Sequence, residues 1–171
     1  MASSPLPHVS TEPIVRCLDR NHCVATWNRV LIQIWRGEAT VEAAQRLVEV
    51  GHAFVAENTG HVCNALSIVE STSPPPGDKV RPLLTALFRE LSPCTRHQMF
   101  VAEGSGFRSA LVRGVGLAVS AIAPKLLPFK FASNVEEAAL TIGPSLPPIA
   151  GGAAALKLAV DAVRAKLDAH G

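Results

Sequence analysis

Short apolar segments rich in β-branched residues alternate along this chain with longer segments in which apolar residues recur every three or four positions. The short segments have the length and composition of β-strands, and the longer ones have the period of amphipathic helices. We expect strands at residues 22–27, 30–35, 62–69, 97–102 and 129–132, and helices at residues 40–58, 79–91, 107–122, 135–140 and 152–170. Strands that alternate with helices in this way predict an α/β domain whose sheet is mixed but mostly parallel.

The first two expected strands are separated by only two residues, Asn28 and Arg29. Two β-prone segments joined by a two-residue turn that contains Asn indicate a β-hairpin. The expected order of elements is therefore ββαβαβαβα, with an antiparallel pair at its start.

The chain divides into three expected regions. Residues 1–19 are rich in Ser, Pro and polar residues, so we expect a poorly ordered N-terminal arm. Residues 20–142 carry the alternating pattern and form the α/β domain. Residues 143–171 contain a Pro-rich link and an amphipathic helix that either folds back over the sheet or serves as an interaction helix toward a partner or a second copy. The apolar positions on one side of this helix are Leu156, Val160, Val163 and Leu167.

The composition is apolar for a chain of 171 residues, which suits a single domain. Hydrophobic residues make up 48% and charged residues 18%, where about 25% charged is usual. One explanation is a deeply buried sheet, because the strands of such sheets are near-continuous apolar segments. The other is an apolar surface that a partner or a second copy covers, which would make the protein a homo-oligomer or part of a complex.

The charge pattern argues against a nucleic-acid partner. The net charge is only +2, the Lys and Arg residues are scattered, and the chain has no Tyr. Nucleic-acid binding usually needs basic residues gathered on one face. The N-terminal segment, residues 1–13, has no apolar core of the length that a signal peptide needs, and no stretch reaches the roughly 18 uninterrupted apolar residues of a membrane span. We therefore expect a cytoplasmic protein without a membrane span.

The four cysteines show no metal-binding spacing. No two of them form a CxxC pair, and only Cys94 with His97, and His61 with Cys63, approach the two-to-four-residue spacing of zinc ligands. We therefore expect free, reduced thiols and no metal site.

The order of elements and one short segment resemble a known family. Residues 131–138, Phe-Ala-Ser-Asn-Val-Glu-Glu-Ala, join the last expected strand of the sheet to a short helix that begins with acidic residues. Together with the opening hairpin and three strand–helix crossovers, this segment resembles the STAS family (sulfate-transporter and anti-sigma-factor-antagonist domains), and more closely its cytosolic anti-sigma-antagonist-like branch. The resemblance covers about residues 23–142. It implies a STAS-like sheet with helices packed mainly on one side, to which the C-terminal helix is an addition.

The resemblance also implies a candidate phosphoacceptor loop at Ser71, Thr72 and Ser73. Some family members are switched by phosphorylation of a Ser or Thr after the third strand, in an Asp-Ser/Thr-Ser-Gly-like context, and Thr72 takes the place of that acceptor. This chain departs from the family pattern in three ways: Glu70 replaces the Asp, the Gly is absent, and prolines occupy positions 74–76, where the family begins a helix.

A glycine-rich turn is a candidate anion-binding site. Gly104, Ser105 and Gly106 precede the expected helix 107–122, so backbone amides of this turn, helped by Arg108, are placed to hold an anion. The same glycines are also what a tight strand-to-helix turn requires without any ligand.

No catalytic motif is evident. The chain has no GxSxG elbow, and its six histidines are spread out without an accompanying Asp motif. We expect no enzyme and no cofactor, and instead a non-enzymatic protein–protein interaction module of STAS-like type in bacterial regulation or signalling. The alternative is a small-ligand domain that holds a lipid-like molecule or a nucleotide in an apolar pocket between sheet and helices.

Overall fold

The computed structural model describes residues 10–104 and 129–171. The described strands are β1 (Ile14–Asp19), β2 (His22–Trp27), β3 (Val30–Trp35), β4 (Cys63–Val69), β5 (Thr95–Ala102) and β6 (Phe129–Ala132). The described α-helices are α1 (Val41–Glu57), α2 (Val80–Leu91), α4 (Val135–Ile142) and α5 (Gly152–His170), and two short 3₁₀ turns cover Gly143–Ser145 and Pro148–Ala150. The expected helix at residues 107–122 lies outside the described residues.

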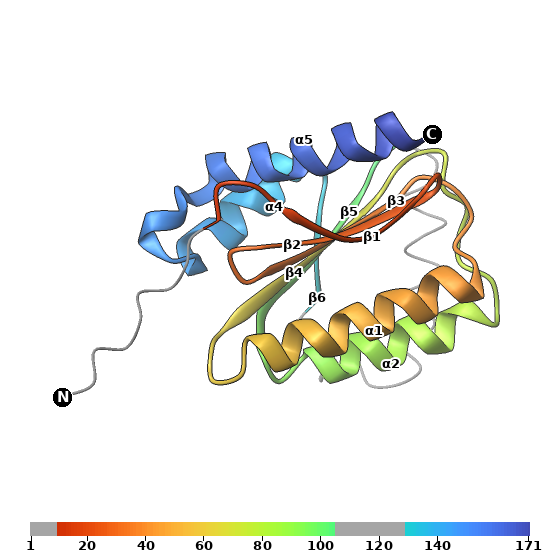
Figure 1. Cartoon of the computed structure of the whole chain (residues 1–171), viewed down its shortest axis with the longest axis horizontal. Helices are drawn as coiled ribbons and strands as arrows, with labels where there is room; N and C mark the ends of the chain where they lie inside the picture. The colour runs from red at the N-terminus through yellow and green to blue at the C-terminus, as the bar shows by residue number, and fades with distance from the viewer. Residues whose placement is uncertain (1–9, 105–128) are drawn as a thin grey trace.

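The described strands form one sheet in which spatial order follows chain order, β1-β2-β3-β4-β5-β6 (Figure 1). Strands β1, β2 and β3 are antiparallel neighbours, whereas β3, β4, β5 and β6 run parallel. The expected hairpin is present, and both residues of its turn have positive φ, 43° at Asn28 and 67° at Arg29. This conformation matches the two-residue turns whose twist suits paired strands. The α/β class and the mostly parallel sheet are thus confirmed.

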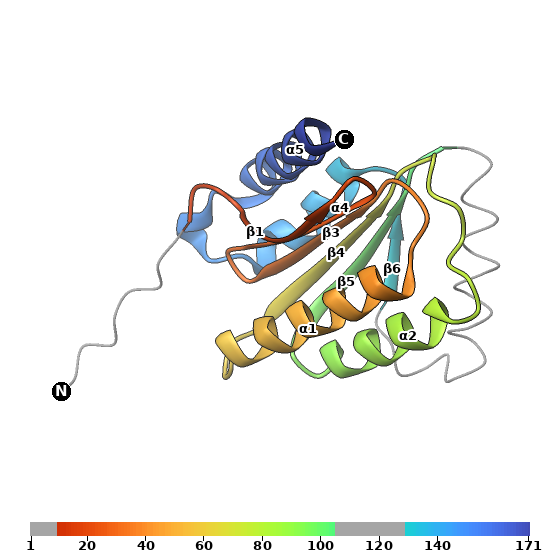
Figure 2. The same cartoon turned by 45° about the vertical axis from the view of Figure 1, so that its right-hand side comes forward.

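Helices cover both faces of the sheet, so the expectation that they pack mainly on one side is wrong. Helices α1 and α2 lie on one face, and α4 and α5 lie on the other (Figures 1 and 2). The physical reason is visible in the strands themselves. Every residue of β2, β3 and β4 is buried, which requires cover on both sides of the sheet.

The N-terminal region is also more ordered than expected. Residues 14–19 form the edge strand β1, which pairs with β2 and has a register shift between Val15 and Cys17. A mixed polar and apolar segment of this kind suits an edge strand, because an edge strand has a solvent-exposed side. The expected arm is therefore wrong for these residues, while residues 1–9 lie outside the described part of the chain.

The C-terminal helix belongs to the same core as the sheet. Apolar side chains of α4 and α5 form one buried cluster with side chains of β2, β3, β4 and β5. The expected boundary after residue 142 therefore does not separate two units, because α5 closes a sheet face that would otherwise expose apolar side chains.

Candidate functional site

Three charged residues follow directly after three parallel strands. Arg36 comes after β3, Glu70 after β4 and Glu103 after β5. The last residues of these strands, Trp35, Val69 and Ala102, are aligned in register. The charged side chains therefore share the carboxyl edge of the sheet, which is the edge where open α/β folds usually bind their ligands.

Helix α5 completes an ion cluster at this edge. We define the carboxyl-edge cluster as Arg36, Glu70, Glu103, Arg164 and Asp168. Arg36 contacts both Glu70 (Nε–Oε2, 2.7 Å) and Asp168 (Nη2–Oδ1, 2.7 Å). Arg164 contacts Glu103 through two bonds (Nη2–Oε1, 2.6 Å; Nη1–Oε2, 3.2 Å) and reaches Glu70 at 3.3 Å. The cluster ties α5 to the ends of three strands.

The cluster holds two guanidinium groups and three carboxylates, so one carboxylate is in excess. Hydrogen bonding to Glu70 raises the pKa of Arg36 above its ordinary range, and the contact with Asp168 adds to this. Burial lowers the pKa of Arg164, but the bonds to Glu103 and the charge of Glu70 outweigh burial and raise it. Glu70 is the most buried member, with 13% of its side chain exposed.

The candidate phosphoacceptor loop lies at the same edge, and its three hydroxyl groups differ in exposure. Ser71 and Thr72 are exposed, and the Thr72 hydroxyl donates to the backbone oxygen of Arg36 at 2.7 Å. Ser73 is only 3% exposed and donates to the backbone oxygen of Gly37 at 2.8 Å. Ser73 is therefore a structural residue, and only Ser71 and Thr72 are accessible to another protein.

The two other expected sites are the glycine-rich turn and the apolar side of α5. In the candidate anion-binding turn, Gly104 has a φ of +90°, which favours glycine, while Ser105, Gly106 and Arg108 lie outside the described residues. The apolar positions of α5 are fully buried against the sheet, so this stripe folds back and is not an exposed contact surface. These positions are Leu156, Val160, Val163 and Leu167.

The cysteines are free thiols in the structure. Burial raises the pKa of all four, to about 11 for Cys23 and Cys63, which keeps these thiols protonated and weakly nucleophilic at neutral pH. Within residues 10–104 and 129–171, no group of three or more His, Cys, Asp or Glu side chains lies close enough to hold a metal ion. The described helices include none that is both long and apolar enough to cross a membrane.

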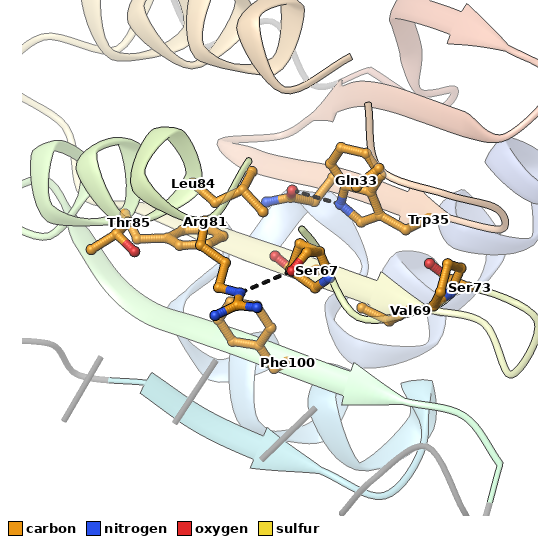
Figure 3. Close-up of a pocket in the computed structure, with 13 residues that line it drawn as sticks. Gln33, Trp35, Ser67, Val69, Ser73, Arg81, Leu84, Thr85 and Phe100 are labelled. Atoms are coloured by element: carbon orange, nitrogen blue, oxygen red, sulfur yellow. Dashed lines mark hydrogen bonds between the residues drawn. The ribbon is translucent and has the colours of Figure 1, made fainter. Parts of the chain in front are cut away.

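A pocket lies between the sheet and α2 (Figure 3). No residues were predicted for such a pocket from the sequence. Its floor includes Gln33, Ser67 and Phe100, which are paired across β3, β4 and β5 and face the same side of the sheet. Side chains of α2, including Leu84 and Thr85, form one wall. A second wall comes from Ser73, Pro74 and Pro76 in the loop after β4, so the pocket adjoins the candidate phosphoacceptor loop.

Gln33 is the unusual residue of this pocket. Its side chain is fully buried, and its oxygen accepts a hydrogen bond from the indole nitrogen of Trp35 at 3.2 Å (Figure 3). The amide nitrogen has no hydrogen-bond partner in the described part of the chain. No site was predicted at this residue, although Gln33 is the one polar residue of the apolar strand β3, which is a signal detectable in the sequence.

Comparisons of the chain with protein-family models, with curated proteins and with solved structures find no match in any of the three.

Proposed function

We propose that the protein is a non-enzymatic protein–protein interaction module of STAS-like type that acts in bacterial regulation, and that its contact surface is the carboxyl edge of the sheet. The surface comprises the exposed residues Ser71 and Thr72 and the adjoining carboxyl-edge cluster. From α5 this surface takes only Arg164 and Asp168, because the apolar side of that helix is buried within the chain.

One observation carries the proposal: an exposed hydroxyl is held in place at the ion cluster. The Thr72 hydroxyl donates to the backbone of Arg36, while the side chain of Arg36 is held by Glu70 and Asp168. This bond holds Thr72 at the cluster, with the exposed Ser71 next to it in the chain. A surface fixed in advance supports binding, because less conformational entropy is lost when the partner docks.

The same geometry supports regulation by phosphorylation of Thr72. A phosphate removes the donor that binds the Arg36 oxygen and adds about −1.5 to −2 charges next to Glu70. Because the cluster already has an excess carboxylate, the phosphate competes with Glu70 for Arg36. The loop is then expected to leave its present arrangement, which would change the contact surface without unfolding the domain.

Affinity purification from the native host, followed by mass spectrometry, tests the proposal. We expect the wild-type chain and a control variant at the opposite edge, Thr59→Glu, to capture the same protein partner. Thr59 is exposed and lies between α1 and β4. Thr72→Glu should lose that partner while keeping the thermal stability of the control. Equal capture by all three proteins, or no enriched protein, would contradict the proposal.

A further inference from the structure

The pocket beside α2 combines an apolar lining with a buried donor that has no hydrogen-bond partner among residues 10–104 and 129–171. Apolar side chains at the site include Trp35, Val69 and Leu84. The donor is the amide nitrogen of Gln33, whose side chain is fully buried. A cavity that is mostly apolar and has a few placed polar groups is typical of small-molecule sites.

The orientation of the Gln33 amide follows from its neighbour. The indole of Trp35 can only donate, so the amide oxygen must face it at 3.2 Å and the nitrogen must point away (Figure 3). The N–H groups on that side require an acceptor. The hydroxyl of Ser67, directly opposite on β4, and that of Thr85 on α2 also line the pocket.

The size of the pocket limits its occupant. The pocket encloses about 50 Å³, which is room for roughly three to five water molecules. A branched group of about four heavy atoms fits this space, or the end of a longer molecule that leaves through the mouth. Arg81 also lines the site, with 41% of its side chain exposed. Its guanidinium pairs with Asp78 at 2.9 Å and donates to the backbone oxygen of Pro76 at 2.9 Å.

We infer that this pocket binds a small apolar molecule through a carbonyl or carboxylate oxygen, which accepts a hydrogen bond from the Gln33 amide. The acceptor requirement comes from the unpartnered nitrogen, and the apolar requirement comes from the lining. This binding site goes beyond the proposed protein contact and does not depend on it, because no protein partner is needed for the ligand to bind.

Three probes of similar shape and different polarity test the inference. Isobutyramide and isobutyrate each carry an acceptor oxygen, whereas isobutylamine carries only a charged donor. In a titration followed by ¹H–¹⁵N NMR, we expect at least one oxygen-bearing probe to shift the side-chain amide of Gln33 and the indole N–H of Trp35 in a saturable way, at concentrations on the order of 10 mM. Binding of only one of the two identifies the preferred charge of the ligand. Isobutylamine should leave both signals unchanged.

Variants distinguish probe binding in the pocket from binding elsewhere on the protein. Gln33→Met removes the donor at similar volume, and we expect it to weaken the oxygen-bearing probe by about fivefold or more. Leu84→Trp should block the pocket from α2 without altering Gln33, which keeps the test open if Gln33→Met does not fold. The control Gln45→Met makes the same chemical change at an exposed position of α1 and should bind as the wild type does.

Two results would overturn the inference. If neither isobutyramide nor isobutyrate shifts the Gln33 amide, the pocket holds only water. If isobutylamine shifts both signals as strongly as the oxygen-bearing probes do, the buried amide does not select an acceptor.

Discussion

The indole N–H of Trp35 donates to the side-chain oxygen of Gln33 at 3.2 Å, two residues along the same strand. Trp35 is 5% exposed and Gln33 is fully buried, so this bond is made almost without solvent. The bond fixes the oxygen of the Gln33 amide, whereas the amide nitrogen has no partner among the residues that the structure describes. A buried donor without a partner costs about 1–3 kcal/mol of folding stability, so the protein carries this cost at the pocket floor.

The bond between Gln33 and Trp35 should appear as a coupling energy. We expect Gln33→Met and Trp35→Phe each to lower the free energy of unfolding by about 1–3 kcal/mol, because each leaves a buried polar partner unpaired or removes buried contacts. The double variant should be less destabilised than the sum of the two by about 1 kcal/mol, since both polar groups are then gone. Chemical denaturation of the four proteins measures this, and strict additivity would show that the bond is not formed.

His22 should make the stability of the protein depend on pH. Its ring is fully buried and stacks on Trp35 with a centroid distance of 4.0 Å. Burial lowers the pKa of His22 to about 4, although the nearby Asp19 acts in the opposite direction and Arg46 adds to the decrease. The folded state therefore favours the neutral ring, whereas in the unfolded chain a histidine has a pKa of about 6.5.

The sign of this dependence follows from proton binding. Between about pH 6.5 and pH 4 the unfolded chain binds more protons at His22 than the folded protein does, so stability falls as the pH falls. We expect a loss of about 3 kcal/mol from this residue between pH 7 and pH 4. His22→Phe keeps a ring over Trp35 but cannot bind this proton, so its stability should fall less between pH 7 and pH 4. Parallel pH profiles of the two proteins would contradict the assignment.

Removal of α5 should unfold the protein. Leu156 and Val163, like the other apolar positions of this side of the helix, have no exposed surface and pack into the cluster that includes the sheet. A chain that ends at residue 149 would expose this sheet face to water. We expect circular dichroism and size-exclusion chromatography to show an unfolded or aggregated product. A folded, monomeric product would mean that α5 is dispensable for the core.

Within the carboxyl-edge cluster, Arg164 should contribute more to stability than an exposed ion pair does. Arg164→Met leaves Glu103 and Glu70 without this partner, and we expect a loss on the order of 1–3 kcal/mol. Lys157→Met is the matched control on the same helix, because the pair of Lys157 and Asp161 is half exposed, and it should change stability by less than about 0.5 kcal/mol. Similar losses of stability in the two variants would show that Arg164 contributes no more than an exposed ion pair does.

Hydrophobic patterning predicted the local elements well. The hairpin, β6 and α5 begin and end at the expected residues. The expected ends of α1, α2 and α4 lie within two residues of the observed ones, and the helix expected at residues 107–122 lies outside the described part of the chain. These elements are local, so periodicity and turn residues define them. The packing of α5 depends instead on which sheet face lacks cover, and β1 depends on pairing with β2. Neither relationship is contained in a short stretch of sequence.

The candidate site was predictable only in part. The loop at residues 71–73 was singled out, but the burial of Ser73 follows from its bond to Gly37, 36 residues away. The ion cluster joins residues far apart in the chain, such as Arg36 and Asp168. No spacing rule connects Glu70 with Arg164, which are 94 positions apart. The polar residues of the pocket left a weak local signal, a Gln and a Ser within apolar strands, and only the sheet register shows that they are neighbours.

Site-specific photo-crosslinking tests the proposed contact surface most directly. A benzophenone amino acid at Ser71 lies on the carboxyl edge, whereas the same group at Thr59 lies in the exposed loop before β4, at the opposite edge. In cells of the native host we expect a discrete crosslinked protein from position 71, lost when Thr72→Glu is added, and no such product from position 59. A product that forms equally from both positions, or only from position 59, would contradict an interaction module that acts through the carboxyl edge.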